Sequence, residues 1–160
     1  MDGSMTPHRY LPKDLIGRRI TGVARVFYEY RGLIEEGDGA VELTLDGEPI
    51  LFEGDGDGER LRVREQAWID PFEEPLSEEN REFVEEHGRW RRVDCSGTKP
   101  YADLCAHKII DACDLVNRFN RVAGVRISVS TASMWFVVDC DESYVFWAHP
   151  IGFTESYSRE

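Results

Sequence analysis

The side chains in this sequence that are best suited to chemistry are four aspartates that fall in two similar turns. They are Asp55, Asp57, Asp139 and Asp141, and the second pair follows the first by 84 residues. Carboxylates at alternate positions are typical of calcium loops, but a loop begun at Asp55 requires glycine at position 60 and glutamate at position 66. Arg60 and Gln66 stand there instead. We therefore predict hairpin turns and no metal ion, while these aspartates remain the candidate metal ligands of the chain.

Thiol and imidazole groups are the second candidates for chemistry. The four cysteines are Cys95, Cys105, Cys113 and Cys140. Cys105, His107 and Cys113 come nearest to a zinc site, but closely spaced ligand pairs and a fourth ligand are absent. A cysteine nucleophile lacks an orienting group, and neither a nucleophile elbow nor a phosphate-binding glycine motif occurs. We predict four buried or half-buried free thiols, no cofactor and no catalytic activity.

Charge is distributed unevenly along the chain, whose formal net charge is −12. Residues 35–86 hold 19 of the 31 acidic residues and only four basic ones, which gives that segment a net charge of −15. Such a field repels nucleic acid and anionic membranes and attracts basic surfaces. Solubility alone can also explain an acidic surface, so both interpretations stay open.

Composition favours a cytoplasmic protein, present as a monomer or a weak homodimer. No apolar run approaches the roughly 20 residues that span a bilayer. The first residues lack the basic and apolar regions of a signal peptide. We expect neither nucleic acid nor membrane as a partner.

An internal repeat indicates which elements must position these groups. Residues 14–20 recur as residues 103–109, at an offset of 89, and the offset then settles at 84. There Val41, Leu43, Leu45 and Phe52 match Val125, Ile127, Val129 and Phe136. Self-similarity at a fixed period defines the architectural unit. We predict one domain, residues 1–160, with two copies of a β-rich module around a pseudo-twofold axis.

Each copy is predicted to begin with a helical turn and to continue as four antiparallel strands. The copies cover residues 12–64 and 101–148, followed by a tail at 149–160. Gly22 is suited to a β-bulge, and Asp46-Gly47 is a strong hairpin signal because both residues tolerate positive φ. Residues 104–116 also match helical spacing, and the repeat favours a strand there.

Residues 65–100 link the copies and are predicted to contain an acidic helix. Ser77 is a good N-cap, acidic side chains follow in the first turn, and Gly88 can end the helix. A strand is expected from Trp90 to Val93. The outward face would present Glu78, Glu82, Glu85 and Glu86.

The first copy carries about five extra residues, as the change of offset shows. They fall near Gly32–Asp38 and combine apolar side chains with acids: Leu33, Ile34, Glu35, Glu36 and Asp38. Insertions into repeated scaffolds lie on loops, and apolar anchors ringed by charge are typical of protein interfaces. The segment is therefore either a binding loop or an ordinary solvated one.

The second copy carries a weak likeness to known proteins. An Asp-x-Asp turn beside an aromatic strand, Tyr144-Val145-Phe146-Trp147, resembles small bacterial immunity-protein-like families that are encoded beside secreted toxins. The resemblance covers mainly residues 125–147. It implies a non-catalytic protein whose acidic surface covers a basic toxin, often a nuclease.

These observations predict an α+β, mostly β fold of two internally duplicated four-stranded antiparallel modules with one acidic helix between them. The function expected is an acidic module that binds a basic protein through the insertion and the helix. The alternative is a small-molecule or metal-ion site in the cleft between the repeats.

Overall fold

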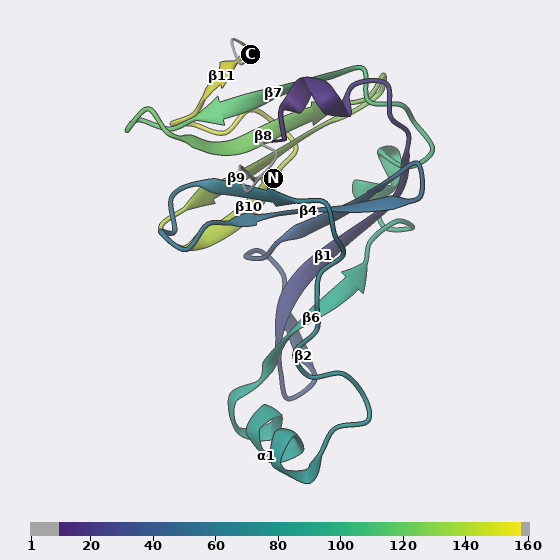
Figure 1. Ribbon diagram of the computed structural model, residues 1–160, viewed down its shortest axis with the longest axis vertical. Coiled ribbons are helices and arrows are strands. Elements are labelled where there is room, and N and C mark those ends of the chain that lie inside the picture. Colours follow the sequence, from purple (N-terminus) through teal and green to yellow (C-terminus); the bar gives the residue numbers. More distant parts are fainter. Residues whose placement is uncertain (1–9, 158–160) are drawn as a thin grey trace, which may run out of the picture.

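Within residues 10–157, which the computed structural model describes, the chain forms two antiparallel β-sheets (Figure 1). The first sheet has the order β2-β1-β3-β4-β5, and β6 also pairs with β1. The second has the order β10-β9-β8-β7-β11. The first sheet consists of β1 (Ile20–Tyr30), β2 (Leu33–Glu35), β3 (Val41–Leu45), β4 (Glu48–Gly54), β5 (Leu61–Arg64) and β6 (Arg89–Asp94). The second consists of β7 (Asp111–Val116), β8 (Val122–Ser128), β9 (Ser133–Asp139), β10 (Glu142–Phe146) and β11 (Thr154–Ser156).

The mostly β prediction is therefore confirmed. Residues 101–148 hold the four strands predicted for the second module, β7 to β10, whereas residues 12–64 hold five, because β2 adds to the four predicted there. The first sheet has six strands and the second has five. β1 is long enough to pair along both edges, with β3 and β2 on one side and β6 on the other. The segment predicted as a tail supplies β11, which pairs with β7.

Two features of the first sheet follow the local signals predicted from the sequence. Asp46 and Gly47 have φ angles of 51° and 84° and join β3 to β4 as a tight hairpin. The predicted bulge lies at Gly22, where the pairing of β1 with β3 shifts register. Residues 104–116 are not a helix: Leu104 follows the short 3-10 helix η2 (Tyr101–Asp103), and β7 begins at Asp111.

The core lies between the two sheets, as the layers in Figure 1 indicate. Phe52 of β4 and Phe136 of β9 are both fully buried, and their ring centroids lie 6.5 Å apart. Aliphatic side chains of β1, β3, β8 and β9 surround them. The space between the sheets is thus filled by side chains, and this packed part of the molecule is called the body below.

Two chain segments join the sheets through paired backbone hydrogen bonds. The N–H of Gly17 donates to the carbonyl of Ile109 (2.8 Å), and the N–H of Ala106 donates to the carbonyl of Ile20 (2.7 Å). Arg18 and Ile109 form a third such bond, and Ile20 and His107 a fourth. The two bonds of each pair are reciprocal. Gly17 and Ala106, the two donors of the first pair, are 89 positions apart, and so are Ile20 and Ile109, its two acceptors.

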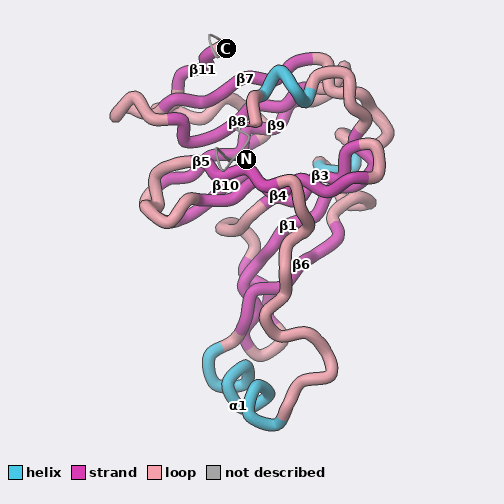
Figure 2. Tube along the Cα trace, in the orientation of Figure 1, coloured by secondary structure: helices cyan, strands magenta, loops and turns pink. Residues whose placement is uncertain are grey.

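A narrow projection, called the stalk below, extends from one side of the body (Figures 1 and 2). It consists of residues 27–36 and 69–91: the end of β1, β2, the segment before α1, α1 (Glu78–His87) itself and the first half of β6. Figure 2 shows α1 as the helix at the far end. The predicted inter-repeat helix thus exists, but it stands away from both sheets.

Candidate functional site

The stalk is built on the antiparallel pairing of β1 with β6. Ala24 through Glu29 pair with Asp94 back to Arg89, so the ladder runs from the body into the stalk without a break. Tyr28 and Trp90 are cross-strand partners whose rings meet edge to face, with centroids 5.5 Å apart. Aromatic pairs of this kind stabilise antiparallel ladders.

A small set of contacts holds α1 on this ladder. Phe83 stacks on Phe72 at 5.6 Å, and Arg89 is buried where its guanidinium donates to the carbonyl of Phe72 (2.9 Å) and pairs with Glu74 (3.4 Å). Ser77 accepts a hydrogen bond from the N–H of Asn80, as an N-cap does. Even so, α1 contains no buried residue. A helix of this length gains most of its stability from tertiary packing, which α1 largely lacks.

Gly88 allows the chain to turn from α1 into β6. Its φ is 79°, and a Cβ at this position would lie 2.6 Å from the carbonyl oxygen of Glu29 and 2.7 Å from the Tyr28 hydroxyl. A larger residue would therefore be strained and would push α1 away from β1.

Eight of the nine predicted partner-binding residues lie on the stalk. Leu33, Ile34 and Glu35 form β2, a short edge strand, and Glu36 follows it, all exposed. The four glutamates of α1 (Glu78, Glu82, Glu85 and Glu86) are exposed as well. Arg31, at the turn between β1 and β2, lines one hollow with Glu82, Glu85 and Glu86, so the hairpin and the helix meet.

Asp38 is the exception, because it lies where the stalk joins the body. Its carboxylate accepts a hydrogen bond of 2.7 Å from the N–H of Ser143 in β10. Its observed contact is therefore structural, tying the insertion to the second sheet.

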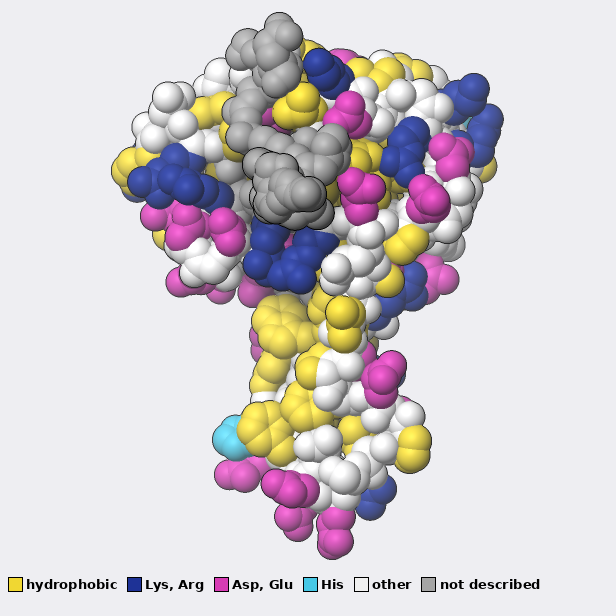
Figure 3. All heavy atoms as spheres, viewed as in Figure 1, with side chains coloured by type: hydrophobic (Ala, Val, Ile, Leu, Met, Phe, Trp, Pro, Cys, Tyr) yellow, Lys and Arg dark blue, Asp and Glu magenta, His cyan; other side chains and the backbone are white. Residues whose placement is uncertain are grey.

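Besides Leu33 and Ile34, the stalk exposes four large apolar side chains that were not among the predicted binding residues. Half of the twelve exposed large hydrophobic residues within residues 10–157 belong to it: Tyr30, Leu33, Ile34, Ile69, Phe83 and Trp90. Leu33 is 75% exposed and Ile69 is 72% exposed. In Figure 3, hydrophobic side chains cover much of the visible face of the stalk, and acidic side chains gather at its end.

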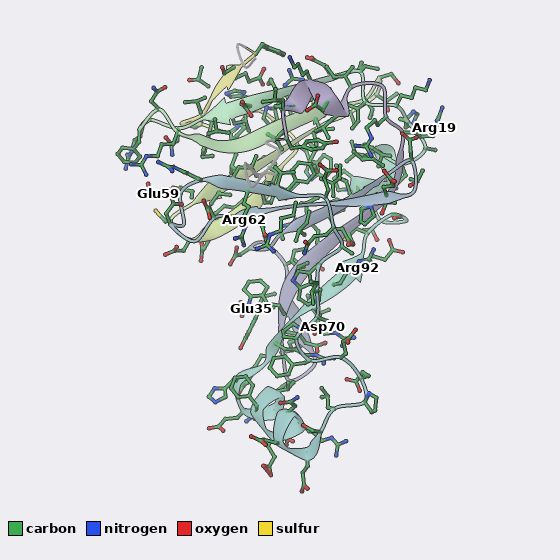
Figure 4. All side chains as sticks on the ribbon, viewed as in Figure 1. Arg19, Glu35, Glu59, Arg62, Asp70 and Arg92 are labelled. Carbon is green, nitrogen blue, oxygen red and sulfur yellow. The ribbon has the colours of Figure 1, made fainter. Side chains whose placement is uncertain are left out.

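Charge on the stalk is strongly negative. Its residues include eleven acids and four arginines, a net of −7 within a chain of net charge −12. Two of those arginines are engaged by acids of the stalk, since Arg91 pairs with Glu29 (3.2 Å) and Arg89 with Glu74. Figure 4 labels Glu35 and Asp70 on the stalk and Arg92 where β6 enters the body.

A pocket of about 290 Å³, called the base pocket below, lies where the stalk meets the body. Two indole side chains, Trp68 and Trp90, contribute to its lining. Four carboxylates contribute as well (Asp38, Glu53, Asp55 and Asp141), and no Lys, Arg or His is among the lining residues. Asp55 and Asp141 come from the β4–β5 and β9–β10 turns, which meet through a 2.9 Å bond from the N–H of Asp141 to the carbonyl of Gly58.

Buried polar groups fix the rim of the base pocket. Arg25 is 2% exposed, and its guanidinium donates to the carbonyls of Gly39 (3.0 Å), Gly37 and Ala40 and to the Tyr101 hydroxyl. Buried Glu42 pairs with Arg92 and accepts the N–H of Trp68 at 3.2 Å. These bonds satisfy the buried charges and hold two walls of the pocket in place.

The candidate metal ligands occupy turns, as predicted, and the two turns lie side by side. Asp55 accepts the N–H of Gly56 at 2.7 Å. Hydrogen bonds from the N–H groups of Glu59 and Arg60 hold the pKa of Asp57 below its ordinary value. Asp139 and Asp141 frame the turn into β10. Among residues 10–157, no group of three or more Asp, Glu, His and Cys side chains is arranged to hold a metal ion.

The cysteines are free thiols in the part of the chain that the structure describes. Burial raises the pKa of Cys95, Cys105 and Cys113, whereas a nucleophilic cysteine needs a lowered pKa. Cys140 is exposed, which corrects the expectation that all four would be buried or half-buried.

A separate cluster fastens β11 to the second sheet. Arg126 pairs with Asp111 (2.9 Å) and with Glu155 (3.1 Å), and Asp111 accepts a 3.0 Å hydrogen bond from Tyr157. Burial alone would raise the pKa of Asp111, but hydrogen bonds from Arg126 and Tyr157 outweigh it and lower that pKa. Burial and the bond to Asp111 raise the pKa of Tyr157 to about 12. The cluster is far from the stalk in sequence and serves the fold.

Comparisons with known proteins leave the site to be interpreted from its own geometry. No protein-family model matches the chain. Searches of curated proteins and of solved structures found no match either. No helix in the described part of the chain has both the length and the apolar character needed to cross a bilayer.

Proposed function

We propose that this protein is a non-catalytic module that binds a basic protein through its stalk. One observation carries the proposal: a projecting element with a net charge of −7 exposes half of the large exposed apolar side chains of the described chain. Apolar side chains surrounded by charge are typical of protein interfaces, and patches of this kind on a soluble surface mark interaction sites.

The weak packing of α1 supports the same proposal. α1 buries no residue, and its Phe83 is half exposed, while Trp90 of β6 and Tyr30 of β1 are exposed elsewhere on the stalk. A partner that covered these side chains would supply the apolar burial that α1 lacks. Negative charge on the stalk would speed the encounter with a basic surface.

Two finer features belong to the proposal. The first is internal duplication, supported by the common strand order β1-β3-β4-β5 and β7-β8-β9-β10 and by the reciprocal hydrogen bonds at an offset of 89. The second is a cytoplasmic location, supported by free thiols, which persist in reducing compartments. A toxin-neutralising role is the sharpest form of the function, and a basic nuclease would be its target.

The alternative function, a small-molecule or metal-ion site between the modules, has one observation in its favour. The base pocket lies where the β4–β5 turn of one module meets the β9–β10 turn of the other. Its two tryptophans and four carboxylates would suit an organic cation better than a metal ion.

Charge variants of the stalk test the proposed function. The tagged protein is used to capture partners from lysate of its native host, and a captured basic protein is purified and its affinity measured by calorimetry at several salt concentrations. The test variant changes six stalk acids to the corresponding amides: Glu35, Glu36, Glu78, Glu82, Glu85 and Glu86. The control variant makes the same change of charge at six exposed acids outside the stalk: Asp14, Asp46, Glu48, Glu65, Asp139 and Glu142.

We expect the stalk variant to weaken binding by at least about a hundredfold and the control by less than about fivefold. Salt dependence should fall only in the stalk variant, because exposed charge pairs are screened by salt. Equal weakening by both variants would show a non-specific charge effect, and unchanged binding by the stalk variant would refute the proposed site.

A further inference from the structure

We propose that the base pocket receives a cationic side chain, arginine or lysine, from the protein that docks on the stalk. This inference rests on the proposed function, and it names the chemical group that the partner must present. It follows from the aromatic walls of the pocket, the charge of its lining and its position at the foot of the docking surface.

Two tryptophans give the pocket its first preference. Trp68 and Trp90 come from different segments and both contribute to the lining. The face of an indole attracts a guanidinium or ammonium group within about 6 Å of the ring, by about 0.5–2 kcal/mol depending on desolvation. Trp90 is 39% exposed and is held edge-on by Tyr28, so its ring is both accessible and oriented.

The carboxylates give the second preference, and they are not equally available. Glu53 is already paired with Arg62 (2.9 Å) and Arg64 (2.8 Å). Asp38 is half-buried and holds the N–H of Ser143, whereas Asp55 and Asp141 are exposed, although Asp55 also accepts the N–H of Gly56. Asp55 and Asp141 form no ion pair with Lys or Arg within residues 10–157. These two aspartates are therefore the groups that a bound cation would meet.

Other classes of ligand fit the base pocket poorly. An anion would face four carboxylates without a basic residue in the lining. An apolar ligand would desolvate those carboxylates without pairing them, which is costly. A metal ion needs three or more convergent ligands, and the described residues hold no such group. A long side chain with an apolar stem and a charged end satisfies both the indoles and the aspartates.

The base pocket also lies in the right place for an anchor. Trp90 belongs both to its lining and to the exposed apolar set of the stalk, so a partner covering the stalk would reach the pocket mouth. Arg25 and Glu42 hold opposite parts of the rim through buried hydrogen bonds. A preformed pocket reduces the ordering cost of binding, and arginine inserted in such a pocket is a common hot spot.

Short capped peptides test the pocket without knowledge of the partner. The probes are acetyl-Gly-Arg-Gly-amide, its lysine analogue and the neutral citrulline analogue, titrated at low ionic strength. Indole N–H signals in NMR spectra report binding, since the chain has four tryptophans and two of them, Trp135 and Trp147, lie outside the pocket as internal references.

We expect the arginine and lysine peptides to shift the Trp68 and Trp90 signals saturably, with dissociation constants on the order of millimolar, as single side chains bind weakly. The citrulline peptide should bind at least about tenfold more weakly, because its charge is absent. Equal shifts with citrulline, or shifts at all four tryptophans, would overturn the inference.

Aspartate variants distinguish the pocket from the rest of the stalk. The double variant Asp55→Asn, Asp141→Asn should weaken the arginine peptide by at least about tenfold, and Asp103→Asn, outside the pocket, should not. The same variants are then compared for binding to the captured partner. If the stalk variant loses affinity for the partner and the double variant does not, the pocket does not receive a partner side chain, and the proposed function still stands. If the arginine peptide binds the pocket but the stalk variant keeps its full affinity for the partner, the proposed docking function is wrong and the pocket is a separate cation site.

Discussion

Glu42 is a buried carboxylate on β3 that joins three segments at the base of the stalk. It is 2% exposed, pairs with Arg92 of β6 and accepts the backbone N–H of Trp68. Removing one partner of a buried charge pair leaves the other group without compensation. Because Arg92 is half exposed and water can hydrate its guanidinium, removing the Glu42 charge costs less stability than it would for a fully buried pair.

The change Glu42→Gln should therefore lower the free energy of unfolding by about 1–2 kcal/mol. Urea denaturation followed by circular dichroism measures it. The control Glu48→Gln, at the exposed first residue of β4, should stay within about 0.5 kcal/mol of the parent. If the free energies of unfolding of the two variants differ by less than about 0.5 kcal/mol, the Glu42–Arg92 pair makes no net contribution to stability.

Acidification should detach β11 before the body unfolds. The pKa values of Asp111 and Glu155 are both lowered: burial alone would raise them, but hydrogen bonds from Arg126 and Tyr157, and from Trp135 and His149, outweigh burial. A lowered folded-state pKa means stability that is fully present above the ordinary values of about 4 and lost as pH falls through the folded value.

Trp135 fluorescence reports this loss, because its indole donates to Glu155 at 3.1 Å. The transition should lie below about pH 4 and should vanish in the double variant Asp111→Asn, Glu155→Gln. If the fluorescence transition persists in the double variant, carboxylates other than Asp111 and Glu155 cause it.

At the scale of elements, the stalk should open more readily than the body. α1 buries no residue, whereas β3 and β8 are buried almost throughout. Amide protection follows buried contacts, so α1 amides should exchange at least about a hundredfold faster than those of β8. Hydrogen exchange followed by mass spectrometry measures both, and equal protection would mean that stalk and body open together.

Gly88→Ala should disturb the stalk selectively. The added Cβ meets the carbonyl of Glu29 at 2.6 Å, and the φ of 79° is unfavourable for alanine, a strain of about 1–3 kcal/mol. Gly97→Ala is the matched control, since its Cβ would meet nothing within 4 Å. We expect faster exchange in α1 for the first variant and unchanged exchange in β8 for both.

Elements defined by short-range signals were predictable from the sequence, and those defined by distant contacts were not. The Asp46-Gly47 hairpin, the Gly22 bulge and the Ser77 cap depend on a few neighbouring residues. β2 and β11 have only three residues each, too few for an alternating pattern. The stalk itself depends on the pairing of β1 with β6, whose paired residues are 60 to 70 positions apart, so its projection had no local signature.

The candidate site was predicted in part for the same reason. The insertion and the acidic helix were singled out by composition, and the structure brings them together at Arg31. Asp38 was assigned by proximity in sequence, yet its carboxylate serves the fold. Trp68 and Trp90 were missed because the two residues meet only through the folding of the linker onto β3 and β1.

At the scale of the whole molecule, the two sheets share one core. Phe52 and Phe136 lie 84 residues apart in the sequence and face each other across the core, with ring centroids 6.5 Å apart. Phe52→Ala and Phe136→Ala should each lower the free energy of unfolding by about 3–5 kcal/mol. Their effects should be less than additive, since both variants enlarge one cavity.

Calorimetry and denaturant unfolding of the single and double variants measure this coupling. A single cooperative transition is expected for the body, because neither sheet keeps a covered face without the other. Two separate transitions, or fully additive effects, would mean that the modules are independent units.

The length of β1 has a mechanical consequence. Its eleven residues begin in the body, where Ile20 to Arg25 pair with β3, and end within the stalk at the turn into β2. A pull on the tip along the strand would load these body hydrogen bonds in shear, all at once, rather than opening them one by one. Tension from a bound partner would thus reach the hydrogen bonds between β1 and β3 in the first sheet, as well as the few contacts that hold the stalk together.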